Sequence, residues 1–372
     1  MRVTVFTLLF LIITGIWLSA AAQKTNNWYS YYNTKTDLYG FKDAKGKIKI
    51  PARFNALTRA WTFRNIIAVM DGNTNKSYYL LKNGQKVAGD SLFVWDMSYD
   101  CEQEEKIRFH DEITDKVGFL GKDGKITIPA VYNDAQPFYN GLALVVYNGK
   151  RICADGKPFN KDSCEHWSWD GPTALINDRG VILADSIDVM TTENLNWYSL
   201  KKTAQPAGSA LYTSFKAKNS GFYNFINYEK EFKSWFYRQF LLNLNQKTLS
   251  EYCFDEVTVK GLFKQTLRKS YTKSNFLKQF VLVLKTKMTA IKQRKLETVI
   301  FSEGLNLFIY HSKKYNAFYT DCGEPNTAKF PLFDVVTSHY NKKKQYDYQE
   351  HFSFLRTANG YRLISVSLKN SK

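Results

Sequence analysis

Recognisable catalytic and metal-binding motifs are missing from this sequence of 372 residues. It has no Cys-x-x-Cys pair, and no two of its five histidines stand at the spacing of metal ligands, so no zinc site is indicated. It also has no Gly-x-Ser-x-Gly turn and no glycine-rich phosphate loop. We therefore predict no catalytic residues, no metal site and no cofactor, and we favour a protein that is not an enzyme.

Long apolar runs are also scarce, and the one at the N-terminus is short for a membrane span. Arg2 precedes the apolar residues 5–18, and Ala20, Ala21 and Ala22 come before Gln23. This order is typical of a cleaved signal peptide, here residues 1–22, and the alternative is a retained membrane anchor. No cysteine for lipid attachment lies nearby. We expect a secreted or periplasmic protein that is not transmembrane after cleavage.

Cysteines are few and odd in number, at positions 101, 153, 164, 253 and 322. In an oxidising compartment they are expected to form disulfides. Cys153 and Cys164 flank a predicted hairpin, so we expect a local bridge there, and a second bridge between Cys253 and Cys322. The alternative is that all five are small buried hydrophobic residues.

Acidic residues are depleted in the second half of the chain. Residues 201–372 contain 29 Lys and Arg against 12 Asp and Glu, so this half carries nearly all of the net charge of +18 of the whole chain. For an exported protein this predicts an unknown protein or an anionic envelope polymer as partner, and no specific nucleic acid. Lys342, Lys343 and Lys344 are candidate contacts for phosphate or sulfate, although lysines also serve solubility alone.

The N-terminal half contains a repeat. Residues 39–55 match residues 117–133 at a constant offset of 78 positions, and residues 78–87 form a degenerate copy between them. In each full copy we expect Gly46 or Gly124 to take a positive φ in a hairpin turn. The following Ile-x-Ile should bury both isoleucines on one face, and the next proline should end the strand. A single hairpin cannot bury its apolar face, so an array of stacked hairpins is predicted.

These motifs resemble the WG repeat of bacterial proteins. The pattern is aromatic-Gly-Phe, a Gly-Lys turn, Ile-x-Ile-Pro and then Phe-x-x-Gly-Leu-Ala, and residues 117–146 fit it closely. Residues 39–69 fit at the start, but residues 61–65 replace Phe-x-x-Gly. The resemblance implies a β-rich repeat that is joined to other modules and serves binding. It supplies no catalytic residues.

The C-terminal half has a different pattern. Residues 201–220 contain Pro206 and Gly208 and predict a linker. Apolar spacing predicts helices over residues 225–244 and 274–291, the second capped by Ser274. Strands are predicted over residues 305–310, 316–319, 352–356 and 361–366, with a type I′ turn at Asn359-Gly360. The order faintly resembles cystatin-like and nuclear-transport-factor-like α+β cones, whose space between helix and sheet is either an open pocket or filled by aromatic residues.

Two further groups of residues are candidate sites. Trp167 and Trp169 place two indoles on one strand face, as in carbohydrate-binding platforms, or else they pack against the neighbouring repeat. Asp100, Glu102, Glu104 and Glu105 form an acidic cluster that either binds a cation or is a solvated loop.

We therefore predict a two-domain protein. Residues 23–200 form an all-β array of WG-like hairpin repeats, and residues 221–372 form a basic α+β domain with helices followed by an antiparallel sheet. The predicted function is non-catalytic binding at the bacterial cell envelope with the repeats as scaffold. The alternative is a hydrolase whose site lies in the C-terminal α+β pocket.

Overall fold

The structure is a computed structural model that describes residues 26–89, 91–160, 162, 164–261 and 268–369. The predicted signal peptide, residues 1–22, lies outside these residues. Within the described ranges, none of the helices combines the length and the apolar character that crossing a membrane requires.

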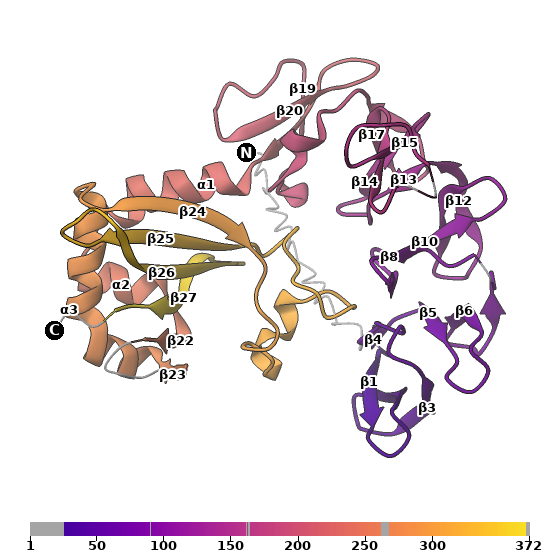
Figure 1. Ribbon diagram of the computed structural model, residues 1–372, viewed down its shortest axis with the longest axis horizontal. Coiled ribbons are helices and arrows are strands. Elements are labelled where there is room, and N and C mark those ends of the chain that lie inside the picture. Colours follow the sequence, from indigo (N-terminus) through magenta and orange to yellow (C-terminus); the bar gives the residue numbers. More distant parts are fainter. Residues whose placement is uncertain (1–25, 90, 161, 163, 262–267, 370–372) are drawn as a thin grey trace, which may run out of the picture.

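Small antiparallel sheets follow one another along an arc through the N-terminal half, which we call the repeat array, residues 28–184 (Figure 1). The sheets are β3-β2-β1-β4, β5-β6-β7, β8-β9, β10-β11-β12, β13-β14-β17-β18 and β15-β16. Their strands are β1 Trp28–Asn33, β2 Leu38–Asp43, β3 Ile48–Phe54, β4 Thr62–Phe63, β5 Ile66–Met70, β6 Ser77–Leu81, β7 Lys86–Val87, β8 Val94–Trp95, β9 Ser98–Tyr99, β10 Lys106–Asp111, β11 Lys116–Gly121, β12 Ile126–Tyr132, β13 Asp134–Ala135, β14 Leu142–Val146, β15 Lys150–Cys153, β16 Trp167–Asp170, β17 Thr173–Asn177 and β18 Ile182–Ala184.

Each full repeat begins with a glycine, Gly40 or Gly118, that allows two strands to approach closely. A Cβ on Gly118 would lie 2.6 Å from the carbonyl oxygen of Ile128 and 2.7 Å from the amide nitrogen of Ala130, so only glycine lets the partner strand approach. Gly40 shows the same two distances in the first repeat. The turn glycines Gly46 and Gly124 have φ values of 86° and 76°, as predicted. Close strand contact and a tight turn are therefore built into both copies.

Two details of the predicted hairpin are wrong. Pro129 lies inside β12 instead of ending it, because the pairing of β11 with β12 shifts register there and the strand needs no proline N–H. Pro51 has the same position in β3. Ile128 is 1% exposed but Ile126 is 62% exposed, so only the second isoleucine is buried. Ile126 lies near the turn, where the hairpin extends past the core.

The predicted linker, residues 201–220, carries strands. β19 (Lys201–Thr203) and β20 (Tyr212–Lys216) pair with β21 (Phe222–Ile226) in the order β19-β21-β20. The fully buried Asn224 joins them, because its side chain bonds to Thr203 Oγ1 at 2.7 Å and Ser214 Oγ at 2.6 Å. The linker prediction is thus wrong, since the turn-forming residues occupy only the loop between β19 and β20. Two short 3₁₀ helices precede this sheet: η1 Val189–Thr192 and η2 Trp197–Ser199.

Helices cover one face of a six-stranded sheet in the C-terminal half (Figure 1). The sheet order is β23-β22-β27-β26-β25-β24, and all pairs are antiparallel except β22 with β27. The elements are α1 Tyr228–Trp235, the π-helical turn η3 Phe236–Phe240, α2 Gln246–Tyr252, β22 Cys253–Lys260, β23 Lys269–Thr272, α3 Lys273–Lys292, β24 Glu297–Glu303, the 3₁₀ helix η4 Lys313–Phe318, β25 Leu332–Tyr340, β26 Tyr346–Thr357 and β27 Gly360–Ser367. The N-cap of α3 is Thr272 rather than the expected Ser274.

Aromatic side chains fill the space between these helices and the sheet. Phe232 of α1 stacks on Phe333 of β25 with ring centroids 4.6 Å apart. Phe236, Phe354 and Tyr361 pack around the pair, and none of the five is more than 3% exposed. The place where a C-terminal pocket was expected is therefore occupied by core residues, which argues against the alternative hydrolase site there.

The other face of the sheet is covered by residues 304–331, which we call the arm. Leu305 and Tyr315 of the arm are at most 2% exposed and pack with Leu355 and Ile364 of the sheet. The strands predicted over residues 305–310 and 316–319 are wrong: these residues form turns and η4, and Leu305, Tyr310 and Phe318 pack on the sheet while Phe308 stays exposed. The predicted hairpin between β26 and β27 is present, but only Gly360 of its Asn-Gly pair has a positive φ, so the turn is not of type I′.

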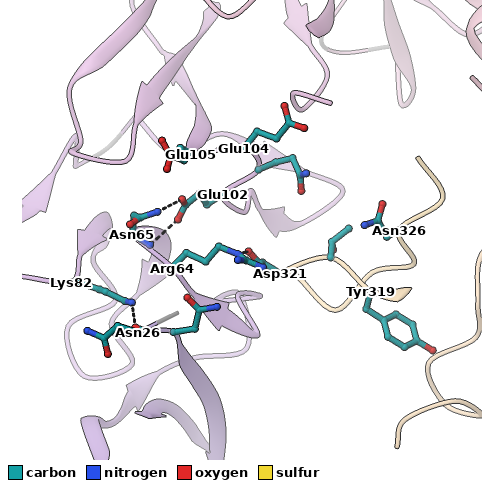
Figure 2. A pocket seen from close by; sticks show the side chains of 13 residues that line it. Asn26, Arg64, Asn65, Lys82, Glu102, Glu104, Glu105, Tyr319, Asp321 and Asn326 are labelled. Carbon is teal, nitrogen blue, oxygen red and sulfur yellow. Dashed lines mark hydrogen bonds and ion pairs between the residues drawn. The ribbon is translucent and has the colours of Figure 1, made fainter. Parts of the chain in front are cut away.

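The tip of the arm docks on the first repeat. The amide nitrogens of Trp61 and Thr62 donate to the carbonyl oxygen of Asp321 at 2.7 and 3.1 Å. The Asp321 carboxylate also forms an ion pair with Arg64 (Figure 2). Gly323, with a φ of 75°, lies so close to the Trp61 indole that a Cβ would be 2.3 Å from the ring. Residues 61–65, where the first repeat departs from Phe-x-x-Gly, are thus the residues on which the arm docks.

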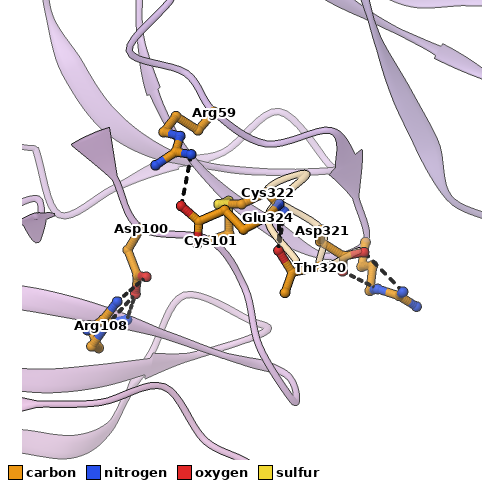
Figure 3. The surroundings of a disulfide bond; sticks show 9 residues. Arg59, Asp100, Cys101, Arg108, Thr320, Asp321, Cys322 and Glu324 are labelled. Atoms are coloured by element: carbon orange, nitrogen blue, oxygen red, sulfur yellow. Dashed lines mark hydrogen bonds and ion pairs between the residues drawn. A yellow bond between two sulfur atoms is a disulfide. The ribbon is translucent and has the colours of Figure 1, made fainter. Parts of the chain in front are cut away.

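Disulfides fix two places in the fold. Cys101 is bonded to Cys322 beside the docked tip (Figure 3), and Cys153 is bonded to Cys164, the local pair that the sequence suggested. The expected pair of Cys253 with Cys322 is wrong. Cys253 lies buried in the core between helices and sheet, and burial raises the pKa of its thiol to about 12.

Candidate functional site

A cavity of about 560 Å³ opens within the repeat array, between consecutive sheets. Volumes of a few hundred Å³ are typical of sites for small ligands. Both tryptophans singled out in the sequence line it. Its lining residues are Leu92, Phe93, Val94, Trp95, His110, Glu112, Asp115, Val117, Asn133, Asp134, Val146, Arg151, Trp167, Ser168 and Trp169.

The β15–β16 ribbon supplies the aromatic wall. Trp167 and Trp169 alternate with Ser168 and so project from one face, and Arg151 pairs directly with Trp169 across the ribbon. The Arg151 guanidinium lies 4.2 Å from the ring centre of Trp167 and 5.1 Å from that of Trp169. A two-stranded ribbon is barely stable by itself. The Cys153–Cys164 bond therefore helps to hold these indoles in place.

The indoles combine packing with an open surface. Trp167 and Trp169 meet edge to face, with centroids 5.4 Å apart and an angle of 85° between their planes. Trp167 nevertheless remains 41% exposed, and Trp95 of β8, which lines the same cavity, is 67% exposed. Trp167 and Trp169 are thus not a coplanar platform. They pack around Arg151 and present indole surface to the cavity.

Polar groups line the remainder of the cavity. Asp115 accepts a hydrogen bond from Arg151 Nη2 at 2.7 Å and lies 3.0 Å from His110 Nε2. Asp134 accepts a hydrogen bond from the Ala135 amide, but burial dominates and raises the pKa of this carboxyl group. Arg151 Nε is buried and has no hydrogen-bond partner among the described residues. The cavity can therefore accept hydrogen bonds and stack against flat or apolar ligand faces.

The lysine candidates lie elsewhere. Lys342, Lys343 and Lys344 form the exposed turn between β25 and β26, with Asn341 Oδ1 accepting from the Lys343 amide at 2.9 Å. The structure does not bring them near Trp167 or Trp169, which lie on β16, the partner of β15 in the array (Figure 1).

The acidic cluster has structural partners. Glu102 is 5% exposed and accepts from the amides of Asn65 and Ile66 at 2.8 and 3.1 Å. Glu104 accepts from the amides of Asn140 and Gly141 at 2.6 and 2.8 Å. Both carboxylates line a second cavity of about 680 Å³ between the array and the arm (Figure 2). Because these oxygens already satisfy backbone N–H groups, the cluster connects loops of the array and does not require a cation.

Asp100 has a different partner. It forms an ion pair with Arg108 at 2.6 Å (Figure 3). Burial works against the Arg108 charge, yet the attraction of Asp100 raises the pKa of the guanidinium.

Several cavity residues were missed in the sequence. Arg151 could have been identified as the cation that faces the two indoles, because it lies two residues before Cys153 on the strand that pairs with theirs. Trp95 and Asp115 lie in separate loops and strands, and they reach the cavity only because successive sheets stack.

Comparison with known proteins confirms the WG repeats expected from the sequence. The family described as "WG containing repeat" matches residues 39–73 and 118–150. No curated protein matches the chain. Among solved structures, that of apo AztD from Citrobacter koseri is 11% identical over 93% of this chain and 95% of that chain, with a TM-score of 0.23. That TM-score is too low to carry over a fold or a function.

Proposed function

We propose, from the premise that residues 39–73 and 118–150 are WG repeats, that this chain is an exported, non-catalytic binding protein of the bacterial cell envelope. The repeat array is the binding scaffold, and the tryptophan-lined cavity is the binding site. The observation that carries the proposal is the cavity itself, about 560 Å³ in volume, with Trp95 and Trp167 exposed inside it.

Exposed indoles support a binding role. Large aromatic side chains lose water-exposed apolar surface when a ligand covers them, and they are frequent anchors in binding sites. Trp95 and Trp167 line the same cavity, and both keep exposed surface. The second WG repeat contributes Val117, Asn133 and Val146 to the cavity, so the repeat fold itself builds the site.

Export is supported by the residues of the N-terminal segment and by the disulfides. An apolar segment after Arg2 and the alanines 20–22 are typical of a signal peptide. Bonds such as Cys101–Cys322 persist in secreted and periplasmic proteins and are rare in the cytosol.

In this proposal the molecule has two domains, with the repeats in residues 23–200 and a basic α+β domain in residues 221–372. The basic domain holds the protein near an anionic envelope polymer. Its excess of lysines favours such a surface at low salt, and the exposed turn at Lys342, Lys343 and Lys344 is one contact.

The test is co-sedimentation of residues 23–372 with purified bacterial cell-wall sacculi and with envelope protein extract. At physiological salt, which screens the basic surface, we expect the protein to be retained, and retention to be lost in the double variant Trp95→Ala/Trp167→Ala. Phe308→Ala is the matched control, since Phe308 is 92% exposed and lies in the arm, away from the cavity. Equal retention of the double variant and the wild type would refute the cavity as the binding site.

A further inference from the structure

The tryptophan-lined cavity differs from an ordinary apolar groove in the type of polar group that it contains. Among the charged side chains of its lining, three are carboxylates, Glu112, Asp115 and Asp134, and one is a guanidinium, Arg151. Arg151 is already engaged, because Asp115 binds its Nη2 and two indoles cover its guanidinium plane. Its buried Nε still lacks a hydrogen-bond partner among the described residues. A ligand that enters the cavity therefore meets three carboxylates and aromatic surfaces, against one guanidinium that is already paired with a carboxylate.

This charge distribution disfavours anionic ligands. A carboxylate, phosphate or sulfate would lose its hydration and be placed beside three carboxylates, while the one guanidinium is already paired with Asp115. The basic residues that could attract an anion, such as Lys342, lie in another part of the fold. The ligand of the cavity and the partner of the basic surface are thus chemically different.

The same residues disfavour a strongly cationic ligand. Asp115 has partners in Arg151 and His110. Burial raises the pKa of Asp134, so its environment resists a full negative charge. Glu112 is the remaining carboxylate of the lining, and it is exposed to solvent. The site therefore suits a ligand that donates many hydrogen bonds without carrying charge, and a sugar hydroxyl is such a donor.

The aromatic surfaces suit the apolar faces of sugar rings. Indoles combine an apolar face with tolerance of nearby polar groups, and pyranose rings present C–H groups on one face and hydroxyl groups at their edges. Trp167 from β16 and Trp95 from β8 supply two such surfaces, 41% and 67% exposed. The turn that follows Trp95 has positive φ values at Asp96 (45°) and Met97 (58°), a strained conformation for residues other than glycine. This turn directly follows Trp95, whose exposed indole lines the cavity and would be covered by a bound ligand.

We propose that the cavity binds an uncharged glycan, with pyranose faces against Trp167 and Trp95 and hydroxyl groups donating to the cavity carboxylates. This inference rests on the proposed function, because it names the ligand class of the same site.

The experiment is isothermal titration of residues 23–372 with defined tetrasaccharides. The neutral probes are N-acetylglucosamine, β-1,4-glucose and α-1,4-glucose tetramers; the charged probes are the glucosamine and galacturonate tetramers. We expect at least one neutral tetramer to bind. Trp167→Ala and Trp95→Ala should each weaken that binding about tenfold, whereas Phe308→Ala should leave it within twofold. Thermal melting of each variant checks that it is folded.

The variant Glu112→Gln distinguishes an uncharged ligand from a cationic one. For a neutral glycan its effect should stay within about threefold, while an ammonium ligand would lose tenfold or more when this charge is removed. Tighter binding of the galacturonate tetramer than of the neutral tetramers would overturn the inference that the ligand is uncharged. Tighter binding of the glucosamine tetramer, with that binding lost in Glu112→Gln, would overturn it as well.

The proposed function and this inference can fail separately. If no tetrasaccharide binds while Trp95→Ala/Trp167→Ala still abolishes retention on sacculi or protein extract, only the glycan inference is wrong. If that variant also leaves retention unchanged, both are wrong.

Discussion

At the scale of single residues, the repeats depend on glycines that leave room for a partner strand. At Gly118 a Cβ would lie 2.6 Å from Ile128 O and 2.7 Å from Ala130 N, and these are backbone atoms that cannot move aside cheaply. The pairing of β11 with β12 would have to open, and the burial of Phe119 would be lost with it.

We therefore expect Gly118→Ala to lower the free energy of unfolding by about 3 kcal/mol or more, within the range of severe single substitutions. Gly208→Ala is the control, because a Cβ there meets nothing within 4 Å and its φ is not in the left-handed region. Urea unfolding followed by tryptophan fluorescence measures both. Equal stability of the two variants would show that the close strand contact is not required.

A second residue-scale prediction concerns His351 of β26. Its Nδ1 lies 2.6 Å from Asp334 Oδ2, and this hydrogen bond raises the pKa of the imidazole; Glu303 adds to the effect, while burial and Lys260 oppose it. Because the folded state holds the proton more tightly than the unfolded chain, the pair stabilises the protein fully below about pH 6.5. That contribution is lost as the pH rises through the raised pKa.

NMR titration of the histidine Cε1–H signals tests the direction of this shift. We expect His351 to titrate above the ordinary value in the wild type and to move down in Asp334→Asn, where the carboxylate charge is gone. A His351 pKa that is higher in Asp334→Asn than in the wild type would contradict the assignment.

At the scale of elements, the β15–β16 ribbon is the piece on which the cavity depends. Cys153 pairs with Trp167 in the ribbon register, and the Cys153–Cys164 bond closes the loop between the strands. Loss of the bond should leave Arg151 and the indoles free to separate.

We expect Cys153→Ser/Cys164→Ser to cost about 3 kcal/mol by the loop-closure estimate, for a bond that spans 11 residues. Retention on sacculi and extract should fall as well, even where the protein remains folded. Hydrogen exchange should rise in residues 150–170 and stay unchanged in the six-stranded sheet. Unchanged exchange in the ribbon would show that the strands are held without the bond.

Local patterns in the sequence predict some elements well. The hairpin glycines Gly46 and Gly124 and the apolar stripe of α3 follow from periods and turn rules that act within a few residues. The run from Leu305 to Tyr310 has the composition of a strand, but β24 already forms that edge of the sheet. Leu305 and Tyr310 instead pack onto the sheet face, an outcome that tertiary contacts decide.

The candidate site shows the same limit. Trp167 and Trp169 could be identified because they lie two residues apart on one strand. Trp95 could not, because it reaches the cavity through the stacking of separate sheets. The partner of Cys322 is likewise beyond local reasoning, since Cys101 lies 221 residues away in the sequence.

At the scale of the whole molecule, the arm connects distant parts of the chain. Its tip binds Trp61 and Arg64 of the first repeat, and Ala328 packs in the core that contains Trp197 and Phe225. The array curves around the arm as an arc (Figure 1). The arm joins the first repeat of the array to the β19-β21-β20 sheet, which follows the last strand of the array. Arg59 adds an ion pair with Glu324 at 2.8 Å (Figure 3).

The Cys101–Cys322 bond should therefore hold the arc in one shape. It closes a loop of 221 residues, so Cys101→Ser/Cys322→Ser should lose up to about 5 kcal/mol by the loop-closure estimate, more than the shorter Cys153–Cys164 loop. Hydrogen exchange should rise in residues 304–331 and 59–65 and remain unchanged in α1 and α3. Adding Arg64→Ala, which removes the ion pair with Asp321, should increase exchange further in the same segments. If exchange rises equally throughout the six-stranded sheet, the bond supports the general fold; if it rises only in the arm and its docking residues, the arm is a separable strap that keeps the repeats in their arc.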